Sequence, residues 1–312
     1  MEDSALDGFL LEGDTEKLVT TLFADDTTVY LTEEDDYSYL IEILNTWCRV
    51  SGAKFNEQKT VLIPIGTREY RHGLLTSRKL KEGGESIPDG CAIAADGTPV
   101  RVLGAYVGNN VSNAEVWTPT LEKITLKLVR WSKGHPTQDG RQKIVGMDVG
   151  GMTQYLTKVQ GMSPEVEEEV TKQIRNFMWD DKSPMVGMET LCAPIAEGGK
   201  GLLDIRARNE AIELMKVKTY LSKPEDRPRW AFVADRLIAQ SSPVSQNVSD
   251  NLKTNPFLQS WSPGLTARSA LPDSLKKMLS VAKKYNVTLD PPLVDVKLRR
   301  EMPAWYTIKG LG

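Results

Sequence analysis

The stretch from Phe23 to Leu31 constrains the fold of this chain more than any other segment of its sequence. It reads Phe-Ala-Asp-Asp-Thr-Thr-Val-Tyr-Leu, so two adjacent carboxylates, Asp25 and Asp26, separate an apolar stretch from a run of β-branched and aromatic residues. Residues of those types favour strands, and Asp favours turns. The pattern therefore predicts a β-hairpin that carries both carboxylates at its tip.

An amphipathic helix is expected directly after this hairpin. Apolar side chains recur there at the 3.6-residue spacing of a helix, at Tyr37, Leu40, Ile41, Leu44, Trp47 and Cys48. Thr32 and Asp35 suggest a capping box before the helix, and Gly52 supplies a stop after it. The segments that follow predict a strand at 59–64, loops or short hairpins at 66–99, and a further β segment at 100–108.

The sequence becomes helical after Asn113. Thr118 and Pro119 suit the N-cap and first positions of a helix. Three further helices are predicted: from about 141 to 160, from 164 onward, and from a cap at Asp204 to about 221. Beyond Ser222, stretches rich in Pro and Ser predict short helices joined by irregular chain.

The fold class expected from these elements is α+β. A length of 312 residues suggests roughly two domains, and 40% of the residues are apolar, which is enough to build real cores. Three separated cysteines and two histidines argue against a disulfide framework, a zinc site and a Ser-His-Asp triad. The acidic N-terminus does not have a signal-peptide pattern, and no stretch approaches the ~20 apolar residues of a membrane span. We therefore expect a soluble, intracellular protein that contacts no membrane.

Charge is distributed unevenly along the chain. Residues 1–66 contain fourteen Asp and Glu against four Lys and Arg, whereas residues 116–160 contain seven Lys and Arg against three acids. An acidic segment followed by a basic helical one suits metal binding beside phosphate binding. Solvated helix faces would give the same counts, so charge alone leaves both interpretations open.

Two adjacent aspartates at a hairpin tip suit one type of chemistry in particular. Phosphoryl transfer from a nucleoside triphosphate is well served by two magnesium ions ~3.5–4 Å apart. Magnesium prefers oxygen ligands, which carboxylates supply. A third carboxylate from a neighbouring strand normally completes such a site. The alternative interpretation is a solvated acidic turn that binds nothing.

Residues 23–31 resemble the core motif of reverse transcriptases of the LINE type, meaning those of non-LTR retrotransposons. Later segments are similar to further motifs of that family, in the family's order: Ser-Gly-Ala-Lys-Phe-Asn-Glu-Gln-Lys-Thr (51–60), Arg-Val-Leu-Gly-Ala-Tyr-Val-Gly-Asn (101–109), Asp-Gly-Arg-Gln (139–142), a thumb signature (177–179 and 191–205) and Met-Pro-Ala-Trp-Tyr (302–306). The thumb signature fits the LINE type better than a group II intron maturase. The resemblance covers almost the whole chain, most loosely between residues 223 and 300.

This resemblance implies a partition of the chain. Residues 1–110 would be the C-terminal part of a right-hand polymerase palm, made of a β-hairpin, a helix, a strand and a further hairpin. Residues 111–222 would be a helical thumb, and residues 223–312 a linker segment that is partly irregular. The implied partners are an RNA template with a DNA primer, or an RNA–DNA duplex, and deoxynucleoside triphosphate in the complete enzyme. An active element of this family would work in the nucleus.

The resemblance also implies roles for individual residues. Asp25 and Asp26 would be catalytic ligands of Mg²⁺, and Lys59 would donate a proton near the outgoing pyrophosphate. Phosphate contacts on the thumb would come from Arg130, Lys133, Arg141 and Lys143. The residues themselves also allow structural interpretations, with Lys59 as an exposed strand-edge lysine and Asn56 as the residue that fixes the preceding turn. The apolar stripes place four aromatic residues in the helical core and not on a base-stacking surface: Trp117, Trp131, Phe177 and Trp179.

The sequence departs from the family pattern before the hairpin. The family's other metal-binding aspartate, its Gly-rich nucleotide-binding segment and its fingers are not found in the 22 residues that precede Phe23. We therefore expect a fragment of an RNA-directed DNA polymerase that does not polymerise DNA by itself. The alternatives are a non-catalytic nucleic-acid-binding module and an inert product of a truncated element. Template, target site and oligomeric state are not readable from the sequence.

Overall fold

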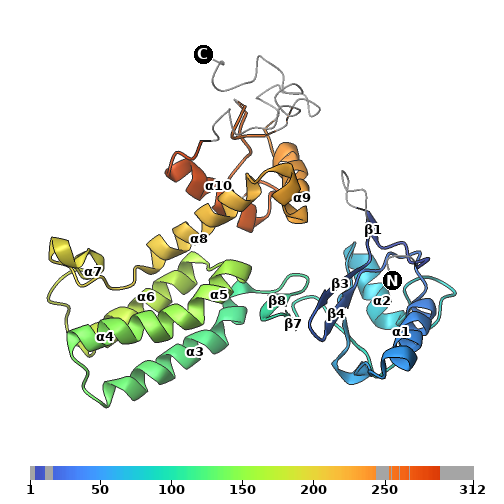
Figure 1. Cartoon of the computed structure of the whole chain (residues 1–312), viewed down its shortest axis with the longest axis horizontal. Helices are drawn as coiled ribbons and strands as arrows, with labels where there is room; N and C mark the ends of the chain where they lie inside the picture. The colour runs from blue at the N-terminus through green and yellow to red at the C-terminus, as the bar shows by residue number, and fades with distance from the viewer. Residues whose placement is uncertain are drawn as a thin grey trace. The chain divides into compact units, whose positions relative to one another are not determined.

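The structure is a computed structural model that describes residues 4–10, 17–243, 253, 255–259, 261–266 and 268–288. The Met-Pro-Ala-Trp-Tyr segment at 302–306 lies outside the described residues. The chain forms two compact units, and most of their helices and strands are labelled in Figure 1. Unit 1 comprises residues 1–130 and 163–166, and unit 2 comprises residues 131–162 and 167–312. The palm, thumb and linker boundaries expected at 110 and 222 remain predictions.

Unit 1 begins with two small antiparallel ribbons. The pairs are β1 (Phe9–Leu10) with β2 (Lys17–Leu18), and β3 (Thr20–Phe23) with β4 (Asp26–Val29). In the second pair Phe23 is aligned with Asp26, so the turn consists of Ala24 and Asp25 alone. The hairpin predicted from the adjacent aspartates is confirmed, with Asp25 in the turn and Asp26 as the first residue of β4.

The amphipathic helix predicted after the hairpin is α1 (Tyr37–Ser51). It begins later than the predicted capping box because Asp36, and not Thr32, caps its first turn. The carboxylate of Asp35 instead accepts a hydrogen bond from the backbone amide of Thr32, which closes a separate turn ahead of the helix. Gly52 ends the helix with a φ of 72°, as predicted, because glycine adopts this left-handed conformation without steric cost.

Residues 66–99 contain a helix where only loops or short hairpins were predicted. This helix, α2 (Arg68–Ser77), is polar along most of its length and buries only Leu74, so its sequence shows no apolar periodicity. It lies between β5 (Val61–Leu62) and β6 (Ala92–Ile93), which pair in parallel. Parallel strands need a crossover connection, and α2 supplies it.

The β segment predicted at 100–108 is a hairpin of β7 (Val100–Val102) and β8 (Ala105–Val107). Its two turn residues, Leu103 and Gly104, have φ values of 49° and 83°, as a type I′ turn requires. The hydrophobic core of unit 1 lies among the first ribbons, α1, α2 and the loop after α2. Its buried members are Leu6, Val19, Tyr37, Leu40, Leu74, Ile87 and Cys91.

The first helix of the predicted helical region is α3 (Asn113–Ser132). It starts before the predicted N-cap at Thr118, so Pro119 lies inside the helix and removes one main-chain hydrogen bond. Val116 and Trp117 are both buried, and their burial extends the helix on the N-terminal side of the proline. The predicted start was wrong because Thr118–Pro119 is only a local sequence signal, whereas the burial of Val116 and Trp117 comes from tertiary packing.

The remaining helices are α4 (Gln138–Ile144), α5 (Gly151–Gln160), α6 (Pro164–Trp179), α7 (Met188–Cys192), α8 (Ile205–Tyr220), α9 (Arg229–Gln240) and α10 (Asp273–Lys284). A π-helical turn, Val145–Gly150, joins α4 to α5, so the two form one continuous helix. This helix, α6 with its N-terminal proline, and α8 with its cap at Asp204 confirm the three further helices predicted from sequence.

The C-terminal helices share one hydrophobic core within unit 2. Its largest buried members come from α8, α9, α10 and the chain between the last two: Tyr220, Ile238, Trp261, Leu271 and Met278. The short helices predicted beyond Ser222 are therefore present as α9 and α10. The expected α+β class is also confirmed. None of the helices in the described ranges combines the length and apolarity that crossing a membrane requires.

Candidate functional site

The tip of the β3–β4 hairpin presents two carboxylates to solvent. Ala24 has a φ of 54° while that of Asp25 is not positive, which is the pattern of a type II′ turn. Asp25 and Asp26 are both exposed. Neither side chain has a hydrogen bond or an ion pair with another described residue. Both carboxylates are therefore available to a ligand from outside the described residues.

The fit of this hairpin to a magnesium site is partial. Adjacent strand residues point to opposite faces, but Asp25 lies in the turn and only Asp26 lies in a strand, so this alternation does not by itself separate their carboxylates. Magnesium requires six oxygen ligands in near-octahedral geometry. Within the described ranges no group of three or more His, Cys, Asp or Glu side chains is placed to hold a metal. The hairpin thus offers two ligands without a third from the described residues.

Apolar side chains next to the carboxylates are uncovered. Leu22 is 70% exposed and Phe23 is 65% exposed, although both lie in β3. An isolated two-stranded ribbon with exposed apolar residues is marginally stable without a covering partner. The described part of the chain therefore leaves most of the Leu22 and Phe23 side chains exposed to solvent beside the tip of the hairpin.

Lys59 occupies the end of a 3₁₀ turn, Glu57–Lys59, immediately before β5. Its side chain is exposed and forms no ion pair with a described residue. The turn is closed by Asn56. Its side-chain oxygen and its main-chain carbonyl both accept a hydrogen bond from the backbone amide of Lys59, with N···O distances of 3.2 and 3.1 Å. The structural role predicted for Asn56 is thus confirmed, and the chemical role of Lys59 stays a prediction.

Arg141, expected from sequence among the phosphate contacts, is buried. It is 6% exposed, and its Nε donates to the carbonyl of Pro136 at 3.1 Å. One terminal nitrogen donates to the carbonyl of Phe177, and the other contacts the Asp180 carboxylate at 3.0 Å. This guanidinium holds the pKa of Asp180 below its ordinary value through a hydrogen bond and its charge. Arg141 is therefore a structural residue, which corrects the sequence-based expectation.

Three neighbours of Arg141 in α4 share this structural role. Gln138 donates to the carbonyl of Met178 at 2.8 Å, and Gln142 donates to the carbonyl of Gly201 at 3.1 Å. Asp139 pairs with Lys200 at 2.9 Å. One turn of helix thus joins the end of α6 to the glycine-rich loop before α8. The sequence carried no signal for these bonds because their partners lie far away along the chain.

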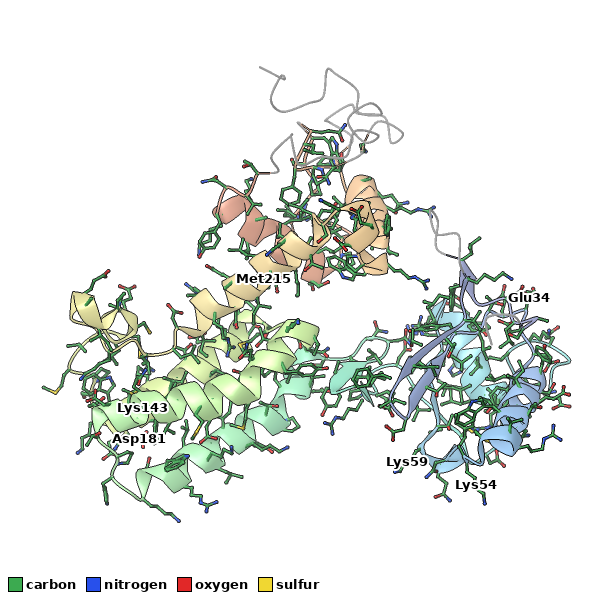
Figure 2. The ribbon with its side chains drawn as sticks, in the orientation of Figure 1. Glu34, Lys54, Lys59, Lys143, Asp181 and Met215 are labelled. Carbon is green, nitrogen blue, oxygen red and sulfur yellow. The ribbon has the colours of Figure 1, made fainter. Side chains whose placement is uncertain are left out.

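The other three basic candidates are exposed. Arg130 lies in the last turn of α3, Lys133 follows that helix, and Lys143 lies in α4. Figure 2 labels Lys143 among the side chains of that helix. From residue 143 to residue 159 the exposed side of the α4–α5 helix carries no acidic residue, because Asp148 is buried. A phosphate contact by these three residues is compatible with their exposure and stays a prediction.

The four aromatic residues assigned to the helical core do not share one environment. Trp117 and Phe177 are buried, as predicted, and Trp179 is half-buried. Trp131 is 43% exposed, and its indole N–H donates to the carboxylate of Asp148 at 2.6 Å. The core assignment was therefore wrong for Trp131, because the hydrogen bond anchors only one edge of its ring and leaves the rest in solvent.

No protein-family model matches this sequence.

Proposed function

We propose that this chain is a portion of the RNA-directed DNA polymerase of a LINE-type retrotransposon. The observation that carries the proposal is the β3–β4 hairpin, whose tight turn presents Asp25 and Asp26 to solvent. Carboxylates at such a tip are the ligands that a magnesium-dependent nucleotidyl transfer needs. Helix α1, the Asn56 turn, β5 and the β7–β8 hairpin follow in the order that the sequence resemblance implies for a palm, with α2 and β6 as additional elements between β5 and β7.

The chain alone is not expected to polymerise DNA, since the described residues place only two carboxylates at the hairpin. The test is extension of a labelled DNA primer on an RNA template with magnesium. The control is the chain with Asp25→Ala and Asp26→Ala together. We expect no extension by either protein. Extension by the unaltered chain that the double substitution abolishes would contradict the conclusion that the site is incomplete.

The family assignment has its own test, the genomic sequence immediately upstream of the codon for Met1. An in-frame continuation with a further aspartate on a strand and a Gly-rich segment is the expected result. A protein that includes the continuation should then extend primers, and Asp25→Ala should abolish the extension. Extension that survives this substitution would contradict the role proposed for the hairpin.

A second candidate function, a non-catalytic nucleic-acid-binding module, is favoured by charge. Lys and Arg outnumber Asp and Glu in unit 2, whereas acids predominate in unit 1. Lys133 and Lys143 are exposed and form no ion pair with a described residue. Exposed lysines of this kind give binding that depends on salt and not on sequence, through release of counterions from phosphates.

The second function is tested by titrating the chain with an RNA–DNA duplex over a range of salt concentrations. Binding should be unchanged in the double variant of Asp25 and Asp26. Replacing Lys133 and Lys143 together with alanine should reduce the salt slope by about 0.9 for each phosphate that the lysines no longer neutralise. An unchanged slope would contradict the interface, and loss of binding in the aspartate variant would favour the polymerase assignment.

A further inference from the structure

We propose that the C-terminal end of α1 and the loop after it form a binding surface for an unpaired nucleic-acid strand. This α1 surface consists of Trp47, Val50, Lys54 and Phe55. Trp47 is 50% exposed, Val50 is 85% exposed and Phe55 is 37% exposed. The proposal deepens the proposed function, on which it rests for its biological setting, because a polymerase handles unpaired template.

The aromatic part of the surface is built by a reversal of the chain. Gly52 adopts a left-handed conformation directly after α1 and turns the backbone back along the helix. This reversal brings Phe55 against Trp47, with ring centroids 5.3 Å apart and planes inclined at 42°. The two rings support each other while half of the indole surface stays in solvent. A preformed, exposed aromatic platform of this kind can stack an unpaired base, which contributes ~1–3 kcal/mol for each base.

Positive charge lies in the loop that carries Phe55, within an otherwise acidic segment. Lys54, which precedes Phe55, and Lys59 are two of the four Lys and Arg residues in positions 1–66, which also contain fourteen acids. Both are exposed, and neither forms an ion pair with a described residue. In the view of Figure 2, Lys54 and Lys59 project from the same end of unit 1. Acidic residues elsewhere in the segment repel phosphates, whereas these two lysines attract them.

The combination of exposed aromatic rings with exposed lysines favours an unpaired strand over a duplex. The bases of a duplex are already stacked on one another, so a duplex could use the cations of the surface but not its rings. An unpaired strand uses both, because its bases expose flat faces and its phosphates lie a few ångströms away from them. Exposed aliphatic side chains such as Val50 add apolar contact with bases or sugars.

The test is fluorescence anisotropy of a labelled oligouridylate titrated with the whole chain. Trp47→Ala should weaken binding by about 5- to 150-fold, which corresponds to the loss of one stacked base. Trp47→Phe should retain most of the affinity because it keeps an aromatic face. Lys54→Ala should reduce the salt slope by about 0.7, the value for one phosphate of a single strand that is no longer neutralised. The matched control is Lys79→Ala, an exposed lysine of the same unit, which should leave the slope unchanged.

Two results would overturn the proposal. One is unchanged oligouridylate binding in both the Trp47→Ala protein and the Lys54→Ala protein, which would assign the surface to a protein contact. The other is a Trp47→Ala protein that loses affinity for oligouridylate and for a blunt duplex by the same factor. Since Trp47 is half exposed, circular dichroism should show unchanged helix content in every variant. Neither result depends on Asp25 or on primer extension, so failure here is distinguishable from failure of the polymerase assignment.

Discussion

Replacing Arg141 with alanine should lower the free energy of unfolding of unit 2 substantially, although the residue lies in an ordinary basic stretch of sequence. The substitution removes two hydrogen bonds from a charged donor to main-chain carbonyls, those of Pro136 and Phe177. Each such bond contributes about 1.5–3 kcal/mol. The contact with Asp180 adds little, because that carboxylate is 46% exposed and regains water when the guanidinium is removed. We therefore expect a loss of about 3–6 kcal/mol.

Urea denaturation followed by circular dichroism measures this loss. The matched control is Lys143→Ala, since Lys143 lies in the same helix but is exposed, and its removal should change stability by less than about 0.5 kcal/mol. Arg141→Lys should recover only part of the stability, because an ammonium group cannot reproduce the planar fork that reaches three acceptors. The free energy of unfolding should therefore decrease from the unaltered chain to Arg141→Lys and then to Arg141→Ala.

Two outcomes would refute this reasoning. The first is an Arg141→Ala protein whose stability lies within about 0.5 kcal/mol of the unaltered chain, as for a surface position. The second is a stable Arg141→Ala protein whose salt slope for duplex binding falls by about 0.9, as expected when one phosphate is no longer neutralised. If the alanine variant does not fold, the Arg141→Lys protein still decides, because a surface phosphate contact would tolerate lysine without loss of stability.

Three further predictions concern other parts of the chain. Asp25→Ala with Asp26→Ala should change stability by less than about 0.5 kcal/mol in thermal melts, because neither carboxylate contacts a described residue; a larger loss would indicate a structural role. Tyr220→Phe should cost about 1.5–3 kcal/mol in urea denaturation, because the buried hydroxyl donates to Asp235 at 2.6 Å. Burial and the nearby Asp235 charge raise the pKa of Tyr220 well above 10.0, so this stabilisation is present below pH 10.0 and is lost as pH rises toward the folded value. In thermal melts, a rise in pH toward the folded pKa of Tyr220 should therefore destabilise the unaltered chain. The Tyr220→Phe variant should not lose stability in this way, because it has no hydroxyl to ionise. Gly199→Ala should prevent the loop before α8 from closing, because its Cβ would lie 2.0 Å from the Ala193 carbonyl oxygen; melts as stable as those of the parent would contradict this loop geometry.

The sequence alone determined the elements whose signals are local. The two aspartates at the hairpin, the stop at Gly52 and the cap at Asp204 are each specified by residues within one turn of the feature. Helical periodicity likewise located α1 and α6, because each buries an apolar stripe along its own length. The polar helix α2 escaped detection for the same reason, since its stripe is reduced to Leu74.

Only the tertiary structure decided which side chains are free to act. Arg141 and Lys143 look alike in the sequence, yet the first reaches a carbonyl 36 residues away and is buried, while the second stays in solvent. Trp117 and Trp131 both fall on an apolar stripe, but only Trp117 is covered. Burial depends on partners that are distant along the chain, so local spacing cannot specify it. For the Asp25–Asp26 hairpin, the sequence supplied the two carboxylates, and the fold decided that no third described carboxylate joins them.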